Sequence, residues 1–276
     1  MSAQAVEHGI YVSVVDRAGN PVDGLGPSDF IVREDRVARE VLRVAPADAP
    51  IQIALLVDNS QAADAYVSDI REGVTAFING LTADSAGKHR IAIITLADRP
   101  TINTEYTSDR AQLLKGAQRI FALSGSGTYL LDGIIETSEG IMKRREPRPV
   151  VVAIATEGPE LSDRGYEQVL EPLRSSTAAF HAVVVGQPLN RSHDRSVVLA
   201  EGTRATGGRY DNLLAGTALP ARMKQVAAEL RHQYRVTYAR PRSLIQPEHV
   251  TVATTRPGLT ARGTQIKPDG EPERPR

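Results

Sequence analysis

Residues 51–62 read IQIALLVDNSQA, an apolar run that stops abruptly at Asp58 and continues as a short polar segment. An almost unbroken Ile/Leu/Val run is typical of a strand in a parallel sheet, because such a strand is covered on both faces. In an open parallel sheet, ligands bind beyond the carboxyl ends of the strands. The segment therefore predicts both the sheet and the place where a binding site is expected.

The same pattern recurs downstream, with amphipathic segments of helical length between the apolar runs. Further strands are predicted at 91–96, 150–155, 180–185 and 209–212, and helices at 64–81, 109–121, 130–145, 163–175, 193–205 and 217–232. Residues 101–106 follow a short Pro-containing link and are predicted to form an antiparallel edge strand. Strands that alternate with helices predict an α/β fold over 50–232, with a doubly wound, mainly parallel sheet.

Both ends of the chain have the pattern of β structure instead. Alternating apolar residues predict strands at 10–15, 30–33 and 41–44, and again at 234–238 and 250–254. Two or three strands are marginally stable alone. We therefore expect 8–48 and 234–263 to form one small, sandwich-like β domain into which the α/β domain is inserted. The Pro-, Gly- and charge-rich tail 267–276 is predicted to be disordered.

The composition excludes several classes of protein. Lys+Arg and Asp+Glu both number 33, and this balance argues against a nucleic-acid-binding protein. The absence of cysteine excludes thiol catalysis, zinc thiolate sites and disulfides. No apolar run approaches the roughly 20 residues of a membrane helix. The first residues, MSAQAVEHG, do not form a signal peptide, which fits a cytoplasmic protein or one whose signal has been removed.

Three polar segments are predicted to meet at the carboxyl edge of the sheet. The first contains Asp58 and Ser60, and the second is the Gly-rich loop 124–128, SGSGT, which ends in Thr128. The third follows the strand 150–155 and reads Thr156-Glu157-Gly158. The order and spacing of these segments, over roughly 180 residues, resemble those of a von Willebrand factor A domain.

The resemblance implies a metal-ion-dependent adhesion site with Asp58, Ser60, Thr128 and Glu157 as its metal ligands. Such a site holds Mg²⁺ through oxygen ligands and waters, and takes an acidic side chain of a protein partner as its last ligand. The sequence departs from the motif at Ala62, where a second Ser is usual, and at Glu157, where Asp is usual. Two alternatives remain. One is a weakened site for Mg²⁺ or Ca²⁺; the other is a sheet edge without a metal ion, in which Asp58 caps the following loop and Thr128 hydrogen-bonds to backbone.

The flanking segments resemble a bacterial group described as VWFA-related proteins of the Acidobacteria type. The matching residues are Asp16, Gly19, Val22, Gly24, Leu25, Asp29 and Phe30 before the α/β domain, and Leu230, Gln233, Tyr234 and Tyr238 after it. This resemblance implies a secreted or periplasmic protein and identifies no partner.

Nothing in the sequence indicates catalysis. Ser60 lacks the Gly-x-Ser-x-Gly context of a nucleophile, no Gly-Lys-Ser/Thr follows the loop 124–128, and the six histidines lie on separate segments. The basic cluster 143–145 with Arg148 is expected to interact with the end of its own helix. We therefore expect a non-catalytic protein-interaction or adhesion module with a degenerate metal site. The alternative is a scaffolding protein that assembles through its β domain.

Overall fold

The computed structural model describes residues 5–83, 88–145, 148–187, 192–242, 247 and 249–266, so the tail predicted to be disordered lies outside the described residues. The chain divides into two compact units. The first combines the residues up to Ala47 with those from His232 onward, and the second is Asp48–Arg231. None of the helices in the described ranges is long and apolar enough to cross a membrane.

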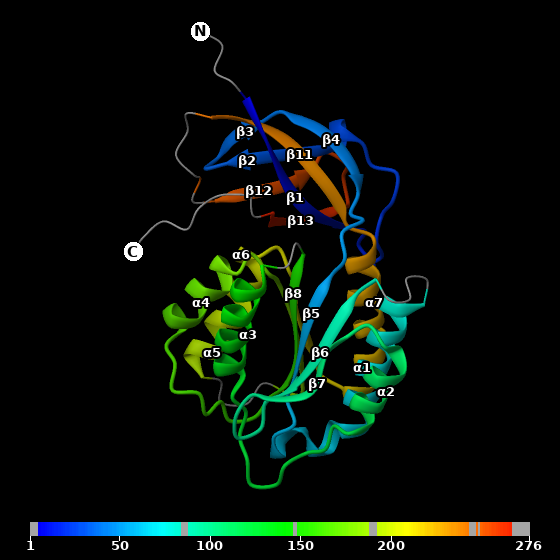
Figure 1. The fold of residues 1–276 in the computed structure, drawn as a ribbon, viewed down its shortest axis with the longest axis vertical. Helices are drawn as coiled ribbons and strands as arrows, with labels where there is room; N and C mark the ends of the chain where they lie inside the picture. Colours follow the sequence, from blue (N-terminus) through cyan, green and yellow to red (C-terminus); the bar gives the residue numbers. More distant parts are fainter. Residues whose placement is uncertain are drawn as a thin grey trace. The chain divides into compact units, whose positions relative to one another are not determined.

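The second unit is built on a six-stranded sheet (Figure 1). In spatial order the strands are β10 (Tyr210–Leu213), β9 (Ala179–Val185), β8 (Pro149–Thr156), β5 (Gln52–Val57), β6 (Arg90–Thr95) and β7 (Thr101–Thr107). All neighbours run parallel except β7, which pairs antiparallel with β6 at the edge. The predicted mainly parallel α/β sheet and its antiparallel edge strand are thus confirmed.

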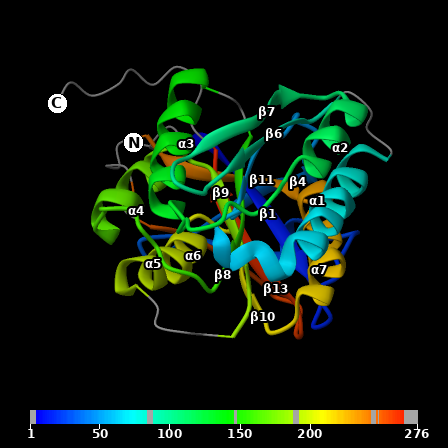
Figure 2. The same cartoon turned by 90° about the horizontal axis from the view of Figure 1, so that it is seen from below.

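Helices cover both faces of this sheet, as Figures 1 and 2 show. One face carries α1 (Val67–Thr82), which follows the 3₁₀ turn η2 (Gln61–Tyr66), together with α2 (Arg110–Gln118) and α7 (Leu219–Arg231), which follows η4 (Gly216–Ala218). The other carries α3 (Leu130–Arg144), α4 (Tyr166–Ser175) and a helical stretch made of α5 (His193–Val197), the π turn η3 (Val198–Gly202) and α6 (Thr203–Ala205). Residues 52–57 are buried throughout, which explains their apolar run.

Helices α1 and α7 pack closely because α1 presents glycines to its partner. A Cβ at Gly73 would lie 2.8 Å from Leu219 Cγ, and a Cβ at Gly80 would lie 2.8 Å from Ala227 Cβ. The carboxyl end of α7 is capped by the buried Arg148, whose Nη2 donates to Leu230 O at 2.6 Å. Arg148 therefore stabilises the end of α7.

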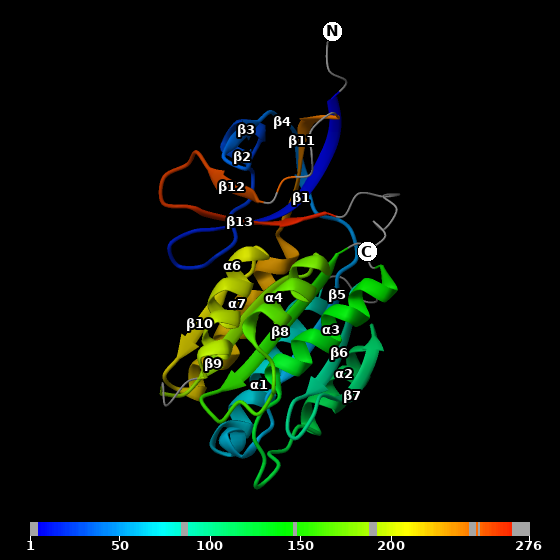
Figure 3. The ribbon, with the colours of Figure 1, turned by 90° about the vertical axis from the view of Figure 1, so that its left-hand side faces the viewer.

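The first unit contains two antiparallel sheets, which Figure 3 shows from the side. One has the order β13 (Thr260–Gln265), β1 (Ala5–Val15), β11 (Tyr234–Pro241) and β4 (Val41–Pro46), and the other β12 (Val250–Thr254), β2 (Phe30–Glu34) and β3 (Val37–Arg39). Strand β13 was not predicted, because its sequence TARGTQ lacks alternating apolar residues.

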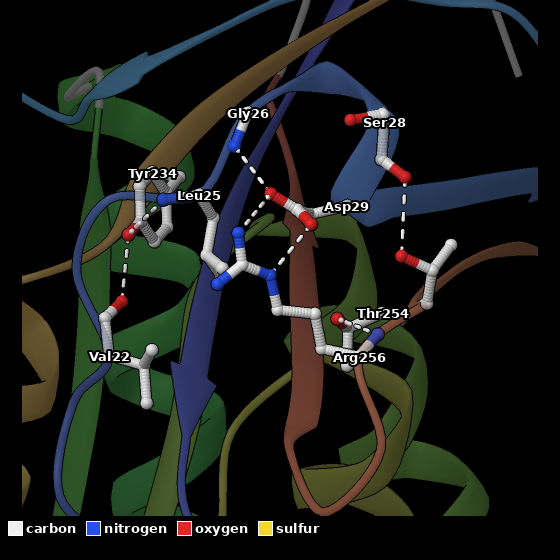
Figure 4. Close-up of polar contacts among 9 residues, drawn as sticks. Val22, Leu25, Gly26, Ser28, Asp29, Tyr234, Thr254 and Arg256 are labelled. Carbon is white, nitrogen blue, oxygen red and sulfur yellow. Dashed lines mark hydrogen bonds and ion pairs between the residues drawn. The ribbon is translucent and has the colours of Figure 1, made fainter.

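The residues that carry the flanking resemblance hold this unit together (Figure 4). The carboxylate of Asp29 accepts hydrogen bonds from Gly26 N at 2.8 Å and from the guanidinium of Arg256 at 2.8 and 3.1 Å. The Tyr234 hydroxyl donates to Val22 O at 2.7 Å. These hydrogen bonds assign the two matching residues Asp29 and Tyr234 a structural role.

A buried ionic cluster lies between the sheets of the first unit. Glu34 is only 2% exposed, and its Oε2 accepts a hydrogen bond from Arg39 Nε at 2.8 Å and lies 3.4 Å from Arg240 Nε. Its Oε1 accepts a hydrogen bond from the Tyr238 hydroxyl at 2.9 Å. Burial and the neighbouring carboxylate raise the pKa of Tyr238, so its hydroxyl remains a donor.

Candidate functional site

The predicted polar segments do meet at the carboxyl edge of the six-stranded sheet, at its lower end in Figure 1. We use the term rim for residues 58–62, 121–129 and 156–162. The first and third segments follow β5 and β8, which are adjacent parallel strands and therefore end side by side. The second connects α2 to α3.

Asp58 ties the first rim segment to the third. It is fully buried, and its Oδ1 accepts a hydrogen bond from Ser60 N at 2.9 Å, as expected of a loop cap. Its Oδ2 accepts hydrogen bonds from Thr156 N at 3.0 Å and Thr156 Oγ1 at 2.5 Å. Thr156 was predicted as part of the third segment, but its contact with Asp58 was not, since only Glu157 was expected to be a ligand.

The first segment is also bound to the second. Asn59 Nδ2 donates to Phe121 O at 3.1 Å, and Asn59 O accepts a hydrogen bond from Leu123 N at 2.8 Å. The side chain of Gln61 accepts a hydrogen bond from Gly125 N at 2.9 Å. Asn59 and Gln61 of the first rim segment therefore hold the backbone of the second segment in place.

Thr128 joins the second segment to the third through its backbone. Its N donates to Pro159 O at 3.0 Å, and its O accepts a hydrogen bond from Leu161 N at 2.8 Å. A Cβ at Gly158 would lie 3.8 Å from Ser60 Oγ, so the third segment also packs against the first. Together these contacts hold all three segments in one unit.

Two hydroxyls in the rim lack the partners that buried hydroxyls normally have. Ser60 and Thr128 are fully buried, and Ser60 Oγ and Thr128 Oγ1 have no hydrogen-bond partner among the described residues. The expectation that the Thr128 hydroxyl binds backbone is therefore wrong. A buried polar atom without a partner is costly, so each such atom calls for an explanation.

The fourth predicted ligand, Glu157, is not brought together with these hydroxyls. Its Oε1 accepts a hydrogen bond from Asn212 Nδ2 at 3.2 Å, and Asn212 belongs to β10, two strands away from β8. A Cβ at Gly186, which follows β9, would lie 3.4 Å from Glu157 Cβ. The side chain of Glu157 therefore extends toward the ends of β9 and β10.

These positions differ from the metal site that the family resemblance implies. The rim offers Ser60 Oγ, Thr128 Oγ1 and the carboxylate of Asp58, but the methyl group of Ala62 stands where a third hydroxyl is usual. A Cβ at Gly158 would meet that methyl at 2.4 Å. The described residues contain no group of three or more His, Cys, Asp or Glu that could hold a metal ion, but such a group is not what this kind of site uses. Mg²⁺ takes oxygen ligands in octahedral geometry and keeps several waters, so waters would have to complete any shell built on these three side chains.

A buried arginine supports the third segment from α5. Arg195 Nη2 donates to Thr156 O at 2.6 Å and Nη1 donates to Gly158 O at 3.2 Å. Burial raises the pKa of the nearby Glu160, and hydrogen bonds from Ser162 and the charge of Arg195 offset part of this shift. Neither Arg195 nor Glu160 belongs to a recognisable motif, so no sequence signal pointed to them.

Exposed apolar side chains gather at the same edge. Among the described residues of the second unit, the exposed large apolar side chains are Ile102, Phe121, Leu123, Leu161 and Leu214. Ile102 pairs with the carboxyl end of β6, Leu214 follows β10, and the other three belong to the rim. Of these, Phe121, Leu123 and Leu161 belong to the rim itself, and exposed apolar residues that adjoin one another are typical of an interaction surface.

Comparison with known proteins agrees with this geometry. Residues 53–158 match the family model described as the von Willebrand factor type A domain. No curated protein matches the chain significantly.

Several solved structures resemble this chain in fold. A von Willebrand factor type A structure from Catenulispora acidiphila aligns with a TM-score of 0.54 at 10% identity, covering 96% of this chain and 74% of that one. Proximal thread matrix protein 1 from the mussel byssus, with a zinc-occupied MIDAS motif, aligns with a TM-score of 0.54 at 14% identity. The alignment covers 72% of this chain and 50% of that one. The von Willebrand factor domain of the pilus tip protein Mfa5 from Porphyromonas gingivalis aligns with a TM-score of 0.51 at 8% identity. The alignment covers 67% of this chain and 96% of that one.

The family match spans β5 to the start of the third rim segment and thus includes all three motifs. The six-stranded sheet with helices on both faces is the fold that the structural neighbours share. The Asp48–Arg231 unit of this chain is therefore a von Willebrand factor type A domain.

Proposed function

We propose that the chain is a non-catalytic protein-interaction or adhesion module that binds its partner through the rim, and that this binding does not require a divalent cation. The observation that carries the proposal is the exposure of three large apolar side chains, Phe121, Leu123 and Leu161, on the loops of the rim. Loops held by a rigid sheet commonly carry binding residues. The family resemblance of residues 9–44 supports a secreted or periplasmic location for this module.

A selection with random peptides tests the proposal. Twelve-residue peptides displayed on phage are selected on the immobilised wild-type chain, and the enriched peptides are then measured on two matched double variants. The rim variant, Leu161→Asp/Leu214→Asp, alters one rim residue and one exposed residue that follows β10. Val37→Asp/Leu42→Asp alters two exposed apolar residues of the first unit. We expect binding to weaken at least about 10-fold on the rim variant only, as for central residues of an interface.

The opposite result would favour the second candidate function, a scaffolding protein that assembles through its β unit. That candidate draws on the exposed Val37, which lies on the edge strand β3, because an unpaired edge strand can pair with another chain. Loss of peptide binding on the Val37→Asp/Leu42→Asp variant alone, together with a concentration-dependent oligomer of the wild type in light scattering, would contradict the rim proposal.

Metal dependence yields a further prediction. We expect 10 mM Mg²⁺ to leave the melting temperature of the wild type unchanged, and to raise that of Ala62→Ser/Glu157→Asp by about 5 °C or more. The estimate assumes a restored site half-saturated at about 0.1 mM, which contributes about 2.7 kcal/mol. Adding Thr128→Ala to the double variant should abolish the gain. A comparable shift in the wild type would show that the present donor set already binds the ion.

A further inference from the structure

The second rim segment displays an aromatic and an aliphatic side chain to solvent. Phe121 is 63% exposed and Leu123 is 44% exposed, in the segment that follows α2. Exposing such side chains costs free energy, since burying one stabilises a protein by about 1.5–3 kcal/mol. The pair lies at the end of the sheet where the proposed function places the partner.

The backbone that carries these two side chains is fixed. Asn59 binds it at both residues, through Phe121 O and Leu123 N, and Ser126 Oγ donates to Leu123 O at 2.7 Å. The side chains of Phe121 and Leu123 are therefore presented on a preorganised loop. A preorganised surface loses little conformational entropy when it binds, and this favours affinity.

Arg71 lies beside Phe121, and the helix that precedes the pair carries further positive charge. The guanidinium of Arg71 lies 4.4 Å from the centre of the Phe121 ring, and its Nε donates to Ile120 O at 2.8 Å. Residues 110–131 contain Arg110, Lys115 and Arg119 but neither Asp nor Glu. Both Lys115 and Arg119 are exposed, on the last turn of α2 and just beyond it. An acidic partner is thus favoured over a basic one.

We propose that Phe121 and Leu123 are the anchor by which the rim holds a partner segment that is both apolar and acidic. Apolar groups of the partner would cover the two side chains, and its carboxylates would face Arg71, Lys115 and Arg119. Aromatic residues beside arginine are the side chains that most often dominate binding energy at protein interfaces. The inference rests on the proposed function and adds the anchor residues and the chemistry of the partner.

The test uses the peptides selected on the wild-type chain. We expect the enriched peptides to combine Leu, Phe or Trp with a net negative charge, and to bind more weakly at 0.5 M salt than at 0.05 M because salt screens exposed charges. The dissociation constant of a synthetic representative should rise at least about 10-fold on Phe121→Ser/Leu123→Ser. It should rise less than about 2-fold on the matched Val37→Ser/Leu42→Ser variant of the first unit, which lies outside the rim. Unchanged melting temperatures confirm that both variants fold.

Other outcomes separate the two proposals. Peptides lost on Leu161→Ser/Leu214→Ser but retained on Phe121→Ser/Leu123→Ser would overturn the anchor and leave the proposed function standing. Enriched peptides that are basic or wholly polar would overturn the assigned partner chemistry. A wild-type chain that enriches no peptide contradicts both proposals. Binding to phosphatidylglycerol vesicles that is lost on Phe121→Ser/Leu123→Ser, without any peptide that depends on these residues, would assign the anchor to a membrane surface and overturn the inference.

Discussion

Replacing Glu34 with Ala is expected to lower the free energy of unfolding of the first unit by about 3–5 kcal/mol. The carboxylate is the group that the guanidiniums of Arg39 and Arg240 both face, and it accepts the hydrogen bond of Tyr238. Removing one member of a buried ionic cluster leaves charge in a medium of low polarity, which costs more than the pair itself contributes. Urea unfolding, with hydrogen exchange followed at β2 and β11, measures the change.

The matched control is Glu7→Ala in the same unit. Glu7 pairs with Arg43, but both side chains are largely exposed, so the loss should stay below about 1 kcal/mol. Equal effects of the two substitutions would mean that burial of the cluster contributes nothing. Faster exchange in β5 or β8 of the Glu34→Ala variant would show that the damage is not confined to the first unit.

Replacing Arg195 with Met is expected to destabilise the second unit by about 2–4 kcal/mol. The substitution keeps an apolar stem of similar length but leaves Thr156 O and Gly158 O without their guanidinium donors. A buried acceptor that loses its donor costs about 1–3 kcal/mol. Arg195→Lys should recover part of the loss, since an ammonium group cannot reproduce the planar fork that reaches both carbonyls.

Thermal or urea unfolding of Arg195→Met beside Arg164→Met checks this expectation. Arg164 pairs with Asp132 at the surface, and its removal should cost less than about 1 kcal/mol. The Arg195→Met variant should also lose affinity for rim-selected peptides, because Thr156 holds Asp58 and thereby the first rim segment. Stability and peptide binding equal to those of Arg164→Met would show that Arg195 does not support the rim.

Much of the fold was predictable because buried strands have an apolar sequence. Strands β5, β8 and β9 are covered on both faces, and their residues are apolar almost without interruption. Strand β13 escaped prediction because it lies at the edge of its sheet and TARGTQ shows no apolar alternation. The domain insertion was expected from strand segments at both chain ends, each too small to be stable alone.

The site was predictable in position but not in detail. A strand end locates Asp58 and Ser60, because the carboxyl ends of parallel strands lie at one edge, and the family resemblance assigns Thr128 to the same edge. The direction of a side chain just past a strand depends on backbone geometry, which explains why Glu157 turns to Asn212 and why Thr156 binds Asp58 instead. The contribution of Arg195 comes from α5, nearly 40 residues after Thr156, and only the folded chain brings them together.

The pairing of β4 with β11 bears on how this chain could have arisen. The chain leaves the first unit after Ala47 and returns at His232, yet Ala47 N donates to Gln233 O at 2.8 Å and Pro46 lies opposite Tyr234. The points where the chain leaves and re-enters the first unit are therefore neighbouring residue pairs at one end of the β4–β11 ladder, like the two ends of a hairpin turn. A gene encoding only the β unit would need a tight turn at this point, and a second gene could be spliced into that turn without disturbing any described strand. The same junction offers protein engineers a place to exchange one binding domain for another.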